Sequence, residues 1–365
     1  MSDLHDLPAR VFSLIESGVV AEFSTVSAAG IPIDTPTYYF PADDMSTIDL
    51  ATGLPNPAKA ERVRRTSKVG LLIEGRPEEP VVVIRAHGAV RDSDIQANAI
   101  RYLAETGYEG ISHGITWEEA RKAVTYWSRI IIENKPERVY WWDSHAALDD
   151  PPQVWSAAPD TVYPTSDPSP ARRMKRSAWP VRPWQDVARE AVEGGTPAHL
   201  SVLDEDGFPL PMRATSFELT AEGFRLAVPT GTPWRLRGRA SLTFAGFRTF
   251  VGDAGADGGA EANGGAEANG GAGVDGGDRV LFRVERSLPQ HPATLDTKQV
   301  LQPSEDTLAK ARARLEYEAE RRGQSLPVIP ADPPPRTRIA LIRRARIASD
   351  APITGITEEH GNRRT

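Results

Sequence analysis

The sequence has no cysteine among its 365 residues. Without thiols the chain cannot form disulfides, thiolate nucleophiles, cysteine zinc sites or cysteine-held iron–sulfur clusters. An HExxH motif and a GxxxxGK[ST] phosphate loop are also missing. The sequence therefore predicts no metal site, and it fits a reducing or redox-indifferent compartment, which we expect to be the cytoplasm.

Long apolar runs and an excess of positive charge are lacking as well. No apolar run approaches the ~18 residues that a membrane-spanning helix needs, and the first ten residues contain no apolar signal segment. Lys and Arg number 43 against 50 Asp and Glu, which gives a formal net charge of -7. We expect a soluble protein that has neither nucleic acid nor a membrane as its partner.

The composition that is present suits ordinary globular cores, with 39% hydrophobic and 25% charged residues. The length predicts two domains. Residues 150–183 are rich in Pro, Ser and Arg and predict a linker, so we place the domains at 1–149 and 184–350, followed by a tail at 351–365. Residues 252–278 are almost entirely Gly, Ala, Asp, Glu and Asn. They predict an expanded hairpin loop between strand-like runs at 242–251 and 279–285.

An internal repeat is the most informative feature of the chain. Residues 18–32 align with residues 195–209 at a constant offset (195 − 18 = 177), so that Gly30 matches Gly207. The pair Thr52-Gly53 has a counterpart in the pair at 230–231, and residues 130–139 resemble residues 339–347, which predicts a strand there too. Three matches in the same order indicate a duplicated domain.

Hydrophobic alternation in the first copy predicts short strands at 21–27, 31–40, 46–53, 68–74 and 81–90. Short helices are expected at 7–17, 56–65 and 116–129, the last of which begins with a capping box formed by Thr116 and Glu119. Many short antiparallel strands with few helices favour a small closed barrel in each half. An amphipathic helix at 304–322 is expected to pack on the second barrel.

One segment of the first copy could hold a phosphate group. Strand 46–53 ends in Thr52-Gly53, and Lys59 follows at the start of a short helix, whose free N–H groups favour an anion. The alternative is a capped surface helix with a solvated lysine.

The order of these motifs resembles the pyridoxamine 5′-phosphate oxidase-like family, the FMN-binding split β-barrel proteins. The resemblance covers most of residues 7–143. Its motifs are ThrProThrTyrTyr at 35–39, LeuAlaThrGly at 50–53, Lys59, ArgArgThrSerLysValGlyLeuLeuIle at 64–73 and ArgValTyrTrpTrp at 138–142. It implies a mainly β fold with short helices (β-barrel, α+β), in which two tandem split β-barrels form a pseudo-dimer.

The resemblance also implies a cofactor site. Thr52, Gly53 and Lys59 match the positions that bind the FMN phosphate. The strand that lies along the flavin ring is matched by Thr35, Pro36, Thr37 and Tyr38, and two further candidates are Arg64 and Ser67. A solvated helix face explains Arg64 and Ser67 equally well. The sequence identifies no catalytic residue.

Two departures from the family narrow the expected function. Residues 140–145 lack the Arg- and His-containing motif that recognises pyridoxal phosphate, so a vitamin B6 oxidase is not expected. The second copy lacks the residues around Lys59, so we expect one flavin site per chain. Two patterns are explained more simply as loops: GxSxG at 110–114 and GxGxxG at 271–276.

The resulting hypothesis is an FMN-dependent oxidoreductase that acts on a small organic substrate, with NAD(P)H or oxygen as its redox partner. The alternatives are an F420-dependent reductase and a non-catalytic flavin- or haem-binding module. The duplication allows a monomer, with the pseudo-dimer inside one chain, or a homodimer.

Overall fold

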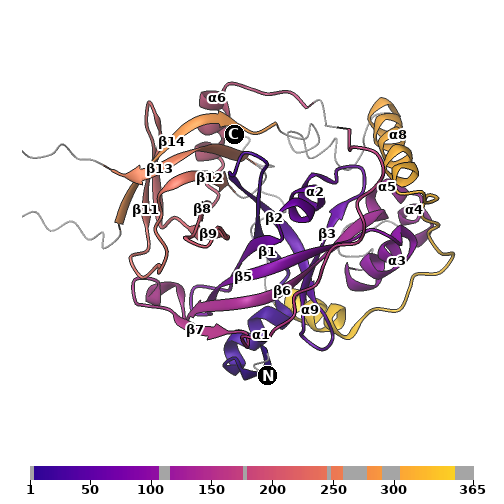
Figure 1. The fold of residues 1–365 in the computed structure, drawn as a ribbon, viewed down its shortest axis with the longest axis horizontal. Coiled ribbons are helices and arrows are strands. Elements are labelled where there is room, and N and C mark those ends of the chain that lie inside the picture. The colour runs from indigo at the N-terminus through magenta and orange to yellow at the C-terminus, as the bar shows by residue number, and fades with distance from the viewer. Residues whose placement is uncertain are drawn as a thin grey trace, which may run out of the picture.

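The computed structural model describes residues 4–106, 116–175, 179–244, 248–257, 278–289 and 305–349. Two seven-stranded antiparallel sheets lie side by side with a few helices around them (Figure 1). The predicted fold class, a mainly β protein with two tandem split barrels, is confirmed. Within the described residues, no helix has both the length and the apolar character needed to cross a membrane.

The first barrel is a closed ring of six strands. They are β1 (Val20–Val26), β2 (Pro32–Pro41), β3 (Ile48–Gly53), β4 (Lys68–Glu74), β5 (Val81–Arg91) and β6 (Arg129–Trp142). Their order is β3-β2-β1-β4-β5-β6, and a pairing of β3 with β6 closes the ring. Phe23 and its inward-facing neighbours fill the core, because side chains alternate between the two faces of a strand.

Short helices cover this barrel. They are η1 (Leu4–Asp6), α1 (Ala9–Ser17), α2 (Ala58–Arg65), α3 (Ile95–Thr106), α4 (Trp117–Ala120), α5 (Val124–Trp127) and η2 (His145–Ala147). The capping box of Thr116 and Glu119 is present as predicted. The single helix expected over 116–129 is wrong, because the backbone leaves the helical conformation at Ala123 and separates α4 from α5. Helix α3 was not predicted.

The second barrel is built from a sheet of seven strands preceded by α6 (Trp184–Glu193). The strands are β8 (Ala198–Leu203), β9 (Pro209–Arg213), β10 (Ser216–Leu219), β11 (Gly223–Val228), β12 (Gly238–Phe244), β13 (Arg248–Ala256) and β14 (Asp278–Ser287). Their order is β10-β11-β14-β13-β12-β8-β9. Among the described residues no strand pairing closes this sheet into a ring, so the closed barrel expected in each half is found only in the first half, and the second is a half-barrel. The two edge strands, β9 and β10, are consecutive in the chain and are separated only by Ala214 and Thr215.

The repeat at 18–32 and 195–209 is confirmed by strand register. In the first barrel Glu22 lies opposite Pro36, and in the second barrel the equivalent His199 lies opposite Arg213. The turn glycines Gly30 and Gly207 also match, with φ values of 71° and 82°. Only glycine adopts this conformation readily, which explains why both copies keep it.

Two expectations for the second barrel need correction. The run 242–251 is not one strand, because it contains the end of β12 and the start of β13, which pair antiparallel with each other. Strand β13 also continues to Ala256, into the segment predicted as a loop. Strands β13 and β14 are paired neighbours, so the Gly-rich segment joins two adjacent strands as predicted. Residues 258–277, with the GxGxxG pattern, lie outside the described residues, as do residues 107–115 with the GxSxG pattern.

The C-terminal helices pack on the first barrel rather than the second (Figure 1). Helix α8 (Glu305–Arg321) confirms the predicted amphipathic helix, but its Leu315 and Ala319 join the core of the first barrel. The expected partner was wrong because helical spacing shows which face is buried and not what buries it. The strand predicted at 339–347 is also wrong, because these residues belong to α9 (Arg338–Ser349), which contacts α1 and α3.

The predicted linker at 150–183 carries structure of its own. It contributes β7 (Gln153–Ser156), which pairs with β6 at the edge of the first sheet. Further along, Asp167 accepts hydrogen bonds from the backbone N–H groups of Asp92 and Ser93, so this part of the linker is fastened to the first barrel. The domain boundaries at 149 and 184 stay a prediction.

Candidate functional site

The outer faces of the two barrels meet along a seam that buries polar side chains. Strands β1, β2 and β4 contact β8, β9 and β12 there. In β1, Phe23 points into the core, and the alternating Glu22 and Ser24 point outward. The equivalent residues of β8 that point outward are His199 and Ser201. We call the group formed by Glu22, Asp34, Glu74, His199 and Arg213 the seam cluster.

His199 bridges two carboxylates from the first barrel. Its Nε2 lies 3.0 Å from Glu74 Oε2, and its Nδ1 lies 3.4 Å from Glu22 Oε1. Burial lowers the pKa of His199, but the negative charges of Glu22 and Glu74 outweigh burial and raise the pKa to about 9. His199 is therefore cationic at neutral pH and holds the two barrels together electrostatically.

Glu22 and Asp34 form a second pair in the seam cluster. Both carboxyl groups are buried, with Asp34 exposed to 1% and Glu22 to 7%. Burial raises the pKa of Asp34 well above its usual range, and the charge of Glu22 raises it further. Burial also raises the pKa of Glu22, although His199 opposes the shift. Burial therefore disfavours the ionised form of both acids.

Several buried polar atoms in the seam have no hydrogen-bond partner among the described residues. They are Glu22 Oε2, Asp34 Oδ2, Glu74 Oε1, His199 Nδ1 and the hydroxyls of Ser24, Ser201 and Ser241. Buried polar groups are normally satisfied, because leaving one unpaired costs about 1–3 kcal/mol. The seam therefore contains buried donors and acceptors that make no hydrogen bond to the described residues.

Three cations form a basic group near the start of the seam: Lys59 and Arg62 on α2, and Arg129 at the start of β6. Burial, together with the positive charges of Arg62 and Arg129, lowers the pKa of Lys59 to about 8, although Asp34 and Glu22 oppose the shift. Arg62 donates from Nε to the hydroxyl of Thr25 at 2.7 Å. Among the described residues, none of the three cations has an ion-pair partner.

Arg129 lies between two aromatic rings. Its guanidinium carbon is 4.4 Å from the ring centroids of Tyr102 and of Tyr126, and its Nε has no hydrogen-bond partner among the described residues. The rings hold the guanidinium by cation–π interactions and leave its N–H groups available. Arg129 also lies beside Gly53 in the β3–β6 pairing. Next to these rings, burial raises the pKa of Tyr38.

The structure brings one set of predicted residues to this region. Thr35, Pro36 and Thr37 are half-buried in the middle of β2, and Tyr38 is exposed to 37%. Thr52 is buried at the end of β3, where its hydroxyl donates to the carbonyl of Asn56 at 3.4 Å. Gly53 follows beside Arg129, and Lys59 lies on the first turn of α2.

Two predicted residues have partners elsewhere. Arg64 donates from Nη2 to Asp92 at 2.8 Å and also hydrogen-bonds the carbonyl of Asp167, so it joins α2 to the linker. The hydroxyl of Ser67 lies 3.3 Å from Nδ1 of His87, whose other nitrogen contacts Glu137 at 2.9 Å. The contacts of Arg64 and Ser67 do not include the three cations or β2.

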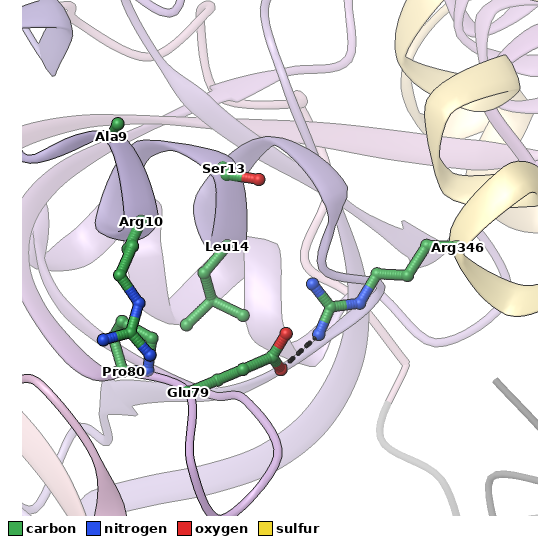
Figure 2. A pocket seen from close by; sticks show the side chains of 7 residues that line it. All are labelled: Ala9, Arg10, Ser13, Leu14, Glu79, Pro80 and Arg346. Atoms are coloured by element: carbon green, nitrogen blue, oxygen red, sulfur yellow. Dashed lines mark hydrogen bonds and ion pairs between the residues drawn. The ribbon is translucent and has the colours of Figure 1, made fainter. Parts of the chain in front are cut away.

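A cavity of about 280 Å³ lies between α1 and α9 (Figure 2). It is lined by Ala9, Arg10, Ser13, Leu14, Glu79, Pro80 and Arg346. Arg346 forms an ion pair with Glu79 at 2.6 Å across its floor. Because none of the predicted site residues lines it, this cavity gives no support to the predicted site.

The sequence did not identify the seam cluster or Arg129. A signal was available for part of it, because the repeat places Glu22 opposite His199 in the alignment, two unlike ionisable groups at one position of a duplicated strand. Arg129 carried no signal, because the residues that surround it come from distant parts of the chain.

No family model matches this sequence, and no curated protein matches it either. Solved structures do resemble parts of it. General stress protein 26 from Bacillus anthracis shares 13% sequence identity with this chain. The match covers 40% of this chain and 96% of the Bacillus protein, with a TM-score of 0.28. A second structure is a Clostridium acetobutylicum protein related to general stress protein 26, of the pyridoxinephosphate oxidase family. It shares 13% sequence identity with this chain, and the match covers 41% of this chain and 96% of the Clostridium protein, with a TM-score of 0.31.

A third structure is PhzG from Burkholderia lata in complex with tetrahydrophenazine-1-carboxylic acid. It shares 11% sequence identity with this chain, and the match covers 44% of this chain and 93% of PhzG, with a TM-score of 0.28. Of these three structures, the Clostridium protein has the pyridoxinephosphate oxidase family in its name. With TM-scores below 0.5, the fold rests on the strand order and register described above.

Proposed function

We propose that this protein is an FMN-dependent oxidoreductase that binds one flavin on the first barrel, beside the seam. One observation carries the proposal: Lys59, Arg62 and Arg129 lie close enough to affect one another's charge, and none has an ion-pair partner among the described residues. Three cations at one place favour a multiply charged anion, and the phosphate of FMN meets this requirement.

The residues present fit such a group. A phosphate would relieve the repulsion that helps to lower the pKa of Lys59 to about 8. It would also offer an acceptor to Arg129 Nε, which lacks one. Asp34 and Glu22 lie near Lys59, but burial raises the pKa of both acids and so disfavours the negative charges that would repel the anion.

The chemistry of the reaction would come from the cofactor, because a bound flavin supplies hydride or electron transfer. The protein has to bind, orient and shield it. Lys59, Arg62 and Arg129 would hold the phosphate, and Thr35 to Tyr38 would lie along the ring. The tyrosines beside Arg129 would shield that end of the site from water.

The second barrel supports one site per chain rather than two. In the first barrel α2 carries Lys59 and Arg62 between β3 and β4. The equivalent connection between β11 and β12, residues 229–237, contains no helix. The second barrel would therefore contribute a wall of the site but no phosphate grip. A small organic molecule as substrate and NAD(P)H as electron donor belong to the same proposal.

The proposal is tested by titrating the full chain with FMN and following flavin fluorescence. Lys59→Met should weaken binding by at least about tenfold, which is ~1.4 kcal/mol, and Lys59→Arg should retain most of it. Lys68→Met is a matched control, because Lys68 hydrogen-bonds the carbonyl of Asp206 and lies outside the basic group. Equal FMN affinity in wild type and Lys59→Met would contradict the proposal.

The same preparation separates the alternatives. Anaerobic addition of NADPH to the FMN-loaded protein should bleach the flavin absorbance. Tight binding of F420 in place of FMN would favour a deazaflavin-dependent reductase. A bound flavin that neither NADH nor NADPH reduces would favour a non-catalytic module, and a Soret band in the purified protein would favour haem.

A further inference from the structure

A serine, a histidine and a glutamate form a chain of hydrogen bonds at the surface of the first barrel. The hydroxyl of Ser67 lies 3.3 Å from Nδ1 of His87, and Nε2 of the same ring lies 2.9 Å from Oε2 of Glu137. Ser67 directly precedes β4, and the other two residues lie in β5 and β6, the next strands of the sheet. Ser67 is exposed, so the chain ends at solvent.

A β-bulge aims Glu137 at the imidazole. In the pairing of β5 with β6, Arg85 lies opposite Arg138 and Ala86 lies opposite Pro136, so Glu137 is the extra residue of β6. Such a bulge turns one side chain out of the regular alternation of a strand. Oε1 of Glu137 accepts a hydrogen bond from Nη2 of Arg85 at 2.8 Å. The orientation of the carboxylate is therefore fixed by one partner at each oxygen.

Two rings from other parts of the chain hold the imidazole in place. The ring centroid of Tyr163, in the linker, lies 4.1 Å from that of His87, and the ring of Phe208, in the second copy, lies 5.3 Å away at 88°. The carboxylate of Glu137 beside Nε2 favours the neutral tautomer that carries its proton on Nε2. Nδ1 is then an acceptor for the hydroxyl of Ser67.

This order of groups is that of a nucleophile, a general base and a residue that orients the base. A serine hydroxyl is a weak nucleophile and becomes reactive beside a base within about 2.6–3.2 Å, a distance that is often longer before a substrate binds. The contacts of His87 with Tyr163 and Phe208 explain how this region fastens the linker and the second copy. They leave the exposed hydroxyl of Ser67 at Nδ1 unexplained.

We propose that Ser67, His87 and Glu137 form a second reaction site, which hydrolyses small carboxylic esters without a cofactor. Ser67 is the nucleophile, His87 is the general base, and Glu137 is a positioning residue that acts through His87. Because Ser67 is exposed, the site takes esters whose carbonyl group is accessible from solvent. This reaction does not depend on flavin binding, so it stands or falls separately from the proposed function.

The reaction needs only water as its co-reactant. The oxygen of Ser67 forms a bond to the carbonyl carbon of the ester while its proton moves to Nδ1 of His87. The bond from that carbon to the alkoxy oxygen then breaks, and the leaving alcohol takes the proton from Nδ1. Water attacks the acyl group in the same way and gives a proton to Nδ1, and the serine oxygen recovers that proton as the acid departs. One ester and one water become one acid and one alcohol.

The first test treats the flavin-free full chain with a fluorophosphonate, which bonds covalently to an activated serine, and locates the adduct by peptide mass spectrometry. The adduct should form on Ser67, and Ser67→Ala should lose it. This variant removes one exposed oxygen and keeps the ring contacts of His87, so it tests the chemistry without disturbing the fold. Ser46→Ala is the matched control, because Ser46 is an exposed serine between β2 and β3, and it should label as wild type does.

The second test separates the roles of the other two residues. His87→Gln and Glu137→Gln should each slow the labelling of Ser67 by at least about 100-fold. Nitrogen NMR of the neutral His87 ring should show its proton on Nε2 in wild type. In Glu137→Gln the new amide can donate to Nε2, so part of the population should carry the proton on Nδ1 instead. A glutamate that only fastened the sheet would leave the tautomer unchanged.

The third test measures turnover of p-nitrophenyl acetate. Wild type should hydrolyse this ester at least about tenfold faster than Ser67→Ala, whose rate gives the background from other side chains. Equal labelling of wild type and Ser67→Ala would overturn the proposal, as would labelling of Ser67 that His87→Gln does not slow. Labelling of Ser67 without faster ester hydrolysis than in Ser67→Ala would overturn it too, because the acyl group would not be released.

Discussion

Glu22 and His199 occupy the same position in the two copies of the repeat, and their side chains lie 3.4 Å apart across the seam. A symmetric pair of barrels would place two identical residues there, with two like charges or two imidazoles in contact. The duplicated chain has an acid on one side and a base on the other. The interface therefore favours pairing of a first copy with a second copy over pairing of two identical copies.

The first prediction concerns the pH dependence of stability. The pKa of His199 rises from 6.5 to about 9 on folding. A raised pKa stabilises the fold fully below pH 6.5, and the contribution is lost as pH rises through 9; at about 1.4 kcal/mol per pKa unit it is of the order of 3 kcal/mol. Urea unfolding should therefore show wild type losing more stability than His199→Gln between pH 6.5 and 9.5. Parallel pH profiles for the two proteins would contradict this.

The second prediction concerns the packing of the barrels. A Cβ on Gly70 would lie 1.8 Å from the carbonyl oxygen of Pro209, so β4 and β9 can approach only because residue 70 lacks a side chain. Gly70→Ala should cost about 3 kcal/mol or more, since backbone atoms must move. Thermal unfolding should then split into two transitions as the barrels uncouple. Gly255→Ala is the control, because its nearest atom, on Arg283, is 4.0 Å away. A single unshifted transition in Gly70→Ala would show that the seam is looser than described.

The third prediction concerns the attachment of α8. Arg322, just after this helix, pairs with Asp92 at 2.8 Å and Glu318 at 2.6 Å, and all three side chains are at most 3% exposed. Arg322→Met would remove one of the two cations that each carboxylate contacts, because Asp92 keeps Arg64 and Glu318 keeps Arg321, and this should cost about 2 kcal/mol. Limited proteolysis should then cut α8 faster than in wild type. Lys310→Met, which removes an exposed ion pair with Asp306, should behave as wild type. If both variants resist the protease equally, the buried ion pairs do not fasten the helix.

The fourth prediction concerns FMN affinity and rests on the proposed function. Because the pKa of Lys59 is about 8, this side chain loses its charge as pH rises above that value. FMN should dissociate more readily at pH 9.5 than at pH 7, by about tenfold for the loss of one phosphate contact. Lys59→Arg should remove most of this dependence, since a guanidinium stays charged. Fluorescence titrations at the two pH values provide the measurement, and an equal pH dependence in both proteins would exclude Lys59 as its source.

The strands could be predicted from the sequence because their signals are local. The bounds expected at 68–74 match β4, and the run expected at 81–90 matches β5 except for one residue. Alternation of side chains and turn glycines such as Gly30 determine these elements with little help from the rest of the chain. The alignment of residues 18–32 with 195–209 agrees with the strand register for the same reason.

The failures concern elements whose conformation or partner depends on distant contacts. Residues 339–347 carry the branched side chains of a strand, but Arg343 stacks on Tyr39 from a helix. Leu315 showed that α8 has an apolar face and gave no indication of which barrel it covers. Glu22 was not singled out from the sequence, because only the position of the second barrel buries it. Of the predicted site, Arg64 and Ser67 have partners elsewhere, and the role of the other residues stays a prediction.

The position of α8 has a consequence for how the molecule can open. The chain leaves the first barrel after β7, forms the second barrel, and returns to the first with α8, so the second barrel is in effect an insertion tethered at both ends. Two tethers keep its effective concentration at the seam high even when the contacts break. Cleavage of either connection alone would leave the halves joined through the other, so any opening at the seam should be local, brief and readily reversed.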